Sequence, residues 1–148
     1  MTSAVVFENQ KDWYTKNRIS KKALKKTILR VAQEHGFHVE LISIVILSDK
    51  KLRDINVAFL NHDYFTDVIT FDLSAAPKTL FGEVYISKDS IINNAQHYNC
   101  STETEFVRVA LHGTLHLCGY KDKSANQKKV MRSKENLYLD YFIQTRDK

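Results

Sequence analysis

The amino-acid sequence predicts an α/β (α+β) fold, a mixed four-stranded sheet packed with about five helices. The length of 148 residues fits one domain, and we expect residues 1–148 to form a single unit. Hydrophobic residues make up 43% and charged residues 26% of the chain, proportions that are ordinary for a globular protein. Strand-like and helix-like segments follow one another in the order β-α-β-α-β-β-α-α-α, which is typical of helices packed on a sheet.

The first half of the chain is expected to contain two strands and two helices. Apolar residues at helical spacing predict a helix that begins at Lys21, after the N-cap Ser20, and stops at Gly36. A second helix is expected after Ser48, which is also a suitable N-cap residue. The strands are expected at 5–7 and at 39–47, and the richness of the longer one in Ile and Val predicts burial on both faces.

The second half is expected to contain two more strands and three helices. The strands are predicted at 68–71 and 82–86, with a turn at 75–78 between them. The helices are predicted around 91–95, from Ser101 or Thr102 to Leu117, and from 126 to 143. The helix ending at Leu117 is apolar almost all round, which places it at the centre of the fold.

Composition also excludes several classes of protein. The longest apolar stretch, 41–47, is far too short to span a bilayer, and the N-terminal residues lack the pattern of a signal peptide. The two cysteines, Cys100 and Cys118, are too few for a disulfide framework and are expected to be reduced. We therefore expect a cytoplasmic protein with no membrane partner.

The segment most informative about chemistry is HGTLHLCGYKD, residues 112–122. His112 and His116 lie four residues apart on the central helix, about 40° apart around its axis and one turn apart along it. Two imidazoles in this arrangement can share one metal ion, although such pairs also occur by chance. Gly119 can end the helix and let the chain return, which would bring Asp122 to the same ion. The spacing predicts a metal site of His112, His116 and Asp122 with a position left for water.

A metalloprotease is the first alternative for this spacing. Zinc proteases with the pattern H-E-x-x-H-x-x-G-x-x-H carry a glutamate after the first histidine. Here Gly113 occupies that position, and glycine cannot take a proton from metal-bound water. The pattern that suggests a protease therefore argues against one.

The run H-G-T-L-H-L-C-G-Y at 112–120 resembles the YbeY-type endoribonucleases, whose signature is H-G-x-L-H-L-x-G-Y-D-H. Residues 56–71 resemble the family block N-x-x-Y-R-x-K-D-x-P-T-D-V-L-S-F, and residues 80–86 resemble its L-G-D-I-x-I strand. The resemblance extends from about 39 to 120. It implies a single-strand-specific, metal-dependent endoribonuclease, a hydrolase of phosphodiester bonds that acts in rRNA processing, in late 16S rRNA 3′-end maturation and in ribosome quality control.

The resemblance also implies a cofactor, partners and a catalytic residue. The cofactor would be one divalent metal ion, zinc, and the partners would be rRNA and the ribosome or its small subunit. His112 would be a catalytic residue as well as a ligand. Lys128, Lys129 and Arg132 follow the metal motif, and we expect them to bind RNA through its phosphates, although such residues are often only a solvated face.

Three of the chain's departures from the family pattern bear on the chemistry of the site. Asp122 stands where the third histidine ligand is usual, and a carboxylate can replace it on zinc. Leu60 stands where the family has an arginine that acts on the phosphate, and leucine cannot. His62, in place of a lysine, is the nearest substitute, or else an ordinary loop residue.

These departures keep two other functions open. One is a non-catalytic ribosome- or RNA-binding factor with a structural metal, and the other is a metal-dependent hydrolase of small substrates. A closed site with four protein ligands would favour the binding factor, whereas an open water position in a basic cleft would favour the nuclease.

Overall fold

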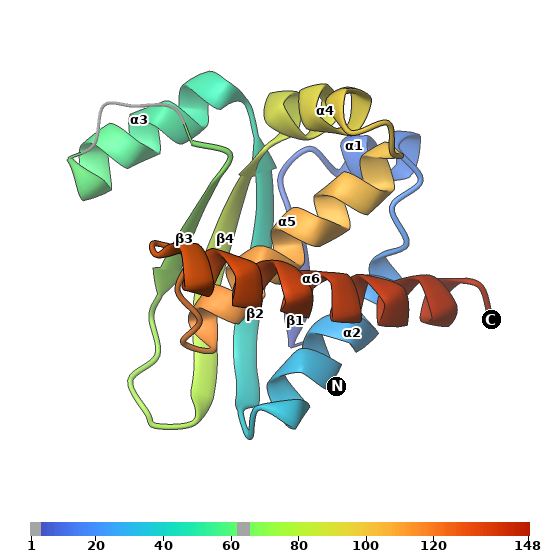
Figure 1. Ribbon diagram of the computed structural model, residues 1–148. Helices are drawn as coiled ribbons and strands as arrows, with labels where there is room; N and C mark the ends of the chain where they lie inside the picture. The colour runs from blue at the N-terminus through green and yellow to red at the C-terminus, as the bar shows by residue number, and fades with distance from the viewer. Residues whose placement is uncertain (1–3, 62–65) are drawn as a thin grey trace.

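The computed structural model describes residues 4–61 and 66–148, and within them a four-stranded sheet of order β1-β2-β4-β3 (Figure 1). Strand β2 (His38–Leu47) runs parallel to both β1 (Val5–Glu8) and β4 (Thr79–Ser87). Strand β3 (Val68–Asp72) pairs antiparallel with β4 and forms one edge. The prediction of a mixed four-stranded sheet is therefore confirmed, and β2 is almost entirely buried, as expected for a strand covered on both faces.

Helices pack against this sheet, and one of them is absent from the sequence prediction. The helices are α1 (Lys11–Lys16), α2 (Lys21–Glu34), α3 (Asp49–Leu60), α4 (Lys88–His97), α5 (Thr102–Leu117) and α6 (Ala125–Arg146). The unpredicted helix is α1, which has six residues and follows the N-cap residue Gln10, whose side chain makes no capping hydrogen bond. It is too short to show helical periodicity, and its place in the fold comes from the burial of Trp13 and Tyr14.

Each of the five longer helices starts at a serine. The hydroxyl oxygen of that serine accepts a hydrogen bond from the backbone N–H three residues later, which satisfies a donor that the helix itself leaves unpaired. The capping residues are Ser20, Ser48, Ser87, Ser101 and Ser124. At Ser124 the side chain of Gln127 also accepts from the backbone of Ser124, which completes a capping box.

Helix α5 lies between the sheet and α6, as its apolar sequence predicts, and α6 crosses over both α5 and α2 (Figure 1). Phe106 and Leu111 of α5 are fully buried. At Gly113 the helix lies so close to the sheet that an added Cβ would be 2.6 Å from the Cγ1 atom of Val84. The same glycine that replaces the protease general base is therefore required by packing. None of the helices in the described part of the chain is long and apolar enough to cross a membrane.

Candidate metal centre

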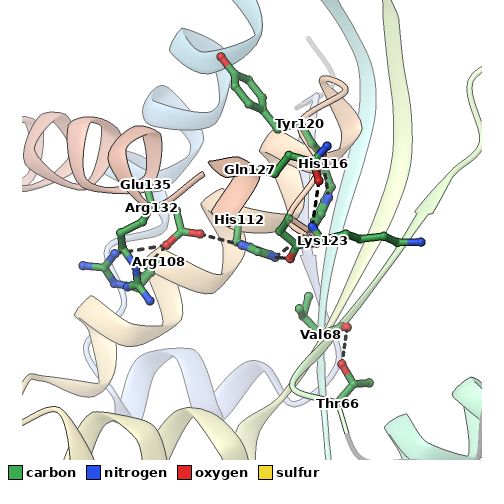
Figure 2. A network of polar contacts seen from close by, with 11 residues as sticks. Thr66, Val68, Arg108, His112, His116, Tyr120, Lys123, Gln127, Arg132 and Glu135 are labelled. Atoms are coloured by element: carbon green, nitrogen blue, oxygen red, sulfur yellow. Dashed lines mark hydrogen bonds and ion pairs between the residues drawn. The ribbon is translucent and has the colours of Figure 1, made fainter. Parts of the chain in front are cut away.

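Three side chains converge where α5 ends and the chain turns back toward α6. Figure 2 shows two of them, His112 and His116, with their rings facing each other. The Nε2 atoms of His112 and His116 lie 3.0 Å apart. One carboxylate oxygen of Asp122, Oδ2, lies 3.2 Å from Nε2 of His112 and 3.3 Å from Nε2 of His116. Gly119 makes this return possible because it adopts φ +104°, and its N–H donates to the carbonyl of His116 at 2.9 Å.

The other nitrogen of each imidazole is held by an acceptor (Figure 2). Nδ1 of His112 donates to Oε2 of Glu135 at 2.7 Å, and Nδ1 of His116 donates to the backbone carbonyl of Tyr120 at 2.9 Å. Because a carbonyl can only accept, Nδ1 of His116 carries a proton, and Nε2 is the ring nitrogen left to bind a metal ion. The Tyr120 hydroxyl donates in turn to Nε2 of His35 at 2.8 Å, which anchors the turn to the end of α2.

This donor set fits a divalent metal ion. Two imidazole nitrogens and a carboxylate oxygen lie within 4.8 Å of one another, so one cation could contact all three. Histidine nitrogen and carboxylate oxygen are usual zinc ligands, and hydrogen bonds from Nδ1 to a carboxylate or carbonyl are the usual support for metal-bound histidines. The predicted metal ligands are therefore brought together as the spacing indicated.

Glu135 was not predicted from the sequence as a site residue. Its side chain is only 7% exposed, on the face of α6 that packs against α5. Arg108 approaches its other oxygen, Oε1, at 3.3 Å, and Arg132 does so at 3.8 Å. One feature of the sequence could have indicated it: Glu135 is at helical spacing from Met131 and Tyr138. An acidic residue therefore lies among apolar ones on the buried face of α6.

Two clefts meet at the candidate metal ligands. The first, of about 370 Å³, is lined by residues of α4, α5, α6 and the start of β3, and the second, of about 620 Å³, by residues of α3, β3 and the α5–α6 turn. Val68, His112 and Asp122 line both. Within the described residues the group has three protein ligands, and their side chains are 22–38% exposed. The arrangement leaves room for water or substrate on a bound ion.

The remaining predicted site residues have different positions. Lys128 and Arg132 line the first cleft, whereas Lys129 is exposed on α6 and lines neither of these two clefts. Leu60 lines the second cleft together with both histidines, so its side chain faces the candidate metal site. His62 lies outside the described residues.

Neither cysteine belongs to the group of candidate metal ligands among the described residues. Both are free thiols. Cys118 packs against the apolar core, and burial raises its pKa to about 11. A thiol in this state is protonated at neutral pH and a poor metal ligand.

Comparison with known proteins gives consistent matches. The family model described as Endoribonuclease YbeY matches residues 6–143. The Endoribonuclease YbeY of Chloroherpeton thalassium is 43% identical over 84% of this chain and 87% of its own length. That of Parabacteroides distasonis is 38% identical, with 82% and 84% covered. The solution structure of TM1509 from Thermotoga maritima superposes with a TM-score of 0.63 at 25% identity, covering 93% of this chain and 87% of that one.

Proposed function

Because this chain belongs to the endoribonuclease YbeY family, we propose that residues 1–148 act as a single metal-dependent endoribonuclease that cleaves single-stranded RNA. The observation that carries the proposal is the open site of three protein ligands at the meeting point of two clefts. A metal with a purely structural role would be enclosed by four protein ligands.

The chain's own residues prepare the site for a metal ion, which we propose to be zinc. His112 and His116 would hold it through Nε2, and Asp122 through a carboxylate oxygen. When bound, such an ion polarises a phosphoryl oxygen and lowers the pKa of a coordinated water. Glu135 fixes the ring of His112 so that its Nε2 lone pair stays directed at the site. His112 is thus the proposed catalytic residue as well as a ligand.

The basic residues near the ligands fit RNA as the substrate. Lys128 and Arg132 line the first cleft, and the exposed Lys129 lies next to Lys128 on α6. Cations along a groove bind the phosphates of any single strand, so the binding is expected to tolerate many sequences. The protein has a formal net charge of +5, which favours an anionic partner.

The resemblance extends the proposal to a cellular role. We propose that the substrate is rRNA, that the activity contributes to late 16S rRNA 3′-end maturation and to ribosome quality control, and that the protein meets the small ribosomal subunit in the cytoplasm. These proposals rest on the family relationship. Primer extension on 16S rRNA from cells lacking the protein tests them, and unchanged 3′ ends would contradict them.

One observation keeps a second function in view. Leu60 gives the second cleft an apolar side chain at the position of the family's arginine, and a factor that binds RNA without cleaving it would tolerate this change. Such a factor would still bind RNA and metal, so binding alone does not separate the two functions.

Cleavage of one labelled single-stranded RNA by three proteins, all purified identically, separates them. We expect the wild type to cleave and His112→Ala to lose both metal and activity. His38→Ala, which removes an exposed histidine at the start of β2, is the matched control and should cleave normally. If the wild type binds metal and RNA but cleaves no faster than His112→Ala, the binding-factor function replaces the nuclease.

A further inference from the structure

Glu105 is a buried carboxylate that the proposed metal chemistry does not use. It lies on α5, seven residues before His112, and is only 5% exposed. Its side chain lines the first cleft and also an adjoining cleft of about 240 Å³. Within residues 4–61 and 66–148, no hydrogen bond satisfies the Glu105 carboxylate.

The neighbouring Arg108 forms its hydrogen bonds with residues other than Glu105. Arg108 directs its Nη1 atom to Oε1 of Glu135 at 3.3 Å and to Oδ1 of Asn136 at 3.0 Å. Burial raises the pKa of the Glu105 carboxyl, and the charge of Arg108 offsets this only in part. Among the described residues, Nε1 of Trp13 is the only fully buried side-chain polar atom without a partner, so the oxygens of Glu105 reach the open cleft. The acceptor atoms of Glu105 are therefore free to receive donors from a ligand in the cleft.

The rest of the cleft resembles a nucleotide site. Its volume of about 370 Å³ lies within the usual range for ligand pockets. Lys128 and Arg132 line it and can hold phosphate oxygens. Tyr98, 62% exposed, also lines it and offers an aromatic ring on which a base can stack. Glu105 is about 10 Å from His112 along the helix axis, a distance that one nucleotide can bridge.

We infer that this cleft binds a guanine base of the RNA beside the metal centre, with the Glu105 carboxylate accepting hydrogen bonds from N1–H and the N2 amino group. Guanine is the base whose Watson–Crick edge presents two adjacent N–H donors, which matches the two oxygens of one carboxylate. Adenine, cytosine and uracil each present one. The inference rests on the proposed action on RNA and adds a base preference to it.

Nucleotide binding tests the inference without requiring cleavage. Calorimetric titration of the zinc-loaded protein at low salt would compare 5′-GMP with 5′-IMP, 5′-AMP, 5′-CMP and 5′-UMP. Inosine lacks the N2 amino group, so it removes one of the two donors with no change to the protein. We expect GMP to bind about tenfold more tightly than IMP or the other nucleotides, the discrimination typical of a bidentate base contact.

A substitution at Glu105 tests whether this residue causes the preference for GMP. Glu105→Gln replaces one acceptor by a donor, so it should lower GMP affinity to the level of IMP. Glu40→Gln makes the same change at an exposed position on β2 and should bind GMP as the wild type does. The inference is overturned if the wild type does not bind GMP, or if it binds GMP and IMP with equal affinity. Because this comparison uses only the wild-type protein, it stays informative even if Glu105→Gln fails to fold.

The inference and the proposed function fail in different ways. RNA cleavage that requires His112, together with indifference to the base, would overturn the guanine site and leave the nuclease in place. A Glu105-dependent preference for GMP without any cleavage would support the guanine site and count against the nuclease.

Discussion

The hydrogen bond from His112 to Glu135 should determine how tightly the metal is held. At 2.7 Å, with the carboxylate 7% exposed, it is a short charge-assisted bond in a poorly hydrated place. Removing a partner that orients a metal-bound histidine typically weakens metal binding by about 10- to 100-fold. We therefore expect Glu135→Ala to weaken zinc binding by that factor, with the ligands themselves unchanged.

The glutamine variant gives a sharper test. Oε2 of Glu135 accepts from His112 while Oε1 faces Arg108, so both oxygens receive donors. Glutamine has one oxygen and one NH2 group, so one of these two donors would always face another donor. Glu135→Gln should therefore also weaken zinc binding, by about tenfold or more.

Competition with a chromogenic zinc chelator measures these affinities. Asn136→Ala is the matched control, because Asn136 also accepts from Arg108, at 3.0 Å, but does not contact His112. Its zinc affinity should stay within about threefold of the wild type. If Glu135→Ala and Glu135→Gln both bind zinc as tightly as Asn136→Ala does, Glu135 does not support the metal site.

Five further changes test other parts of the structure. His116→Ala should abolish stoichiometric metal by elemental analysis, whereas Asp122→His should tighten zinc binding, since it supplies a third imidazole; a His116→Ala protein with full metal content would refute the ligand assignment. Leu60→Arg should raise the rate of single-stranded RNA cleavage, by up to about 10²–10³-fold if the guanidinium reaches the phosphate, and an unchanged rate would mean that another group binds it. Gly113→Ala should lower the free energy of unfolding by about 1–3 kcal/mol in urea titrations, because its Cβ would overlap Val84, and wild-type stability would contradict the close approach of α5 to the sheet. Replacing three basic residues together by neutral ones should make RNA affinity less dependent on salt; these are Lys128, Lys129 and Arg132. The slope of log affinity against log salt concentration should become shallower by about 0.7 per lost phosphate contact, and an unchanged slope would show that these residues do not contact RNA.

Much of the fold was predictable because its signals are local. Serine caps and helical spacing mark the five longer helices, and runs of β-branched residues mark the strands. The exception is α1, because six residues are too few to show a helical spacing of apolar residues, and the side chain of Gln10 does not cap the helix. What places α1 is the packing of Trp13 and Tyr14 against residues distant in sequence, and no local pattern encodes that.

The convergence of the three candidate metal ligands was predictable for the same reason. His112 and His116 share a helix face, and Gly119 provides the turn that returns Asp122 to them. Glu135 was not predictable as their partner, because 23 residues separate it from His112 and only the crossing of α6 over α5 brings the two together. The prediction for His62 stays untested by the structure, since that residue is outside the described part of the chain.

The central claim is an open metal site of three protein ligands, and anomalous diffraction from crystals of the purified protein tests it most directly. Maps from data collected on both sides of the zinc absorption edge should show one peak, at about 2.0–2.2 Å from Nε2 of His112, Nε2 of His116 and a carboxylate oxygen of Asp122, with a water completing the coordination. A peak enclosed by four protein ligands, or stoichiometric metal bound elsewhere in the molecule, would contradict the claim.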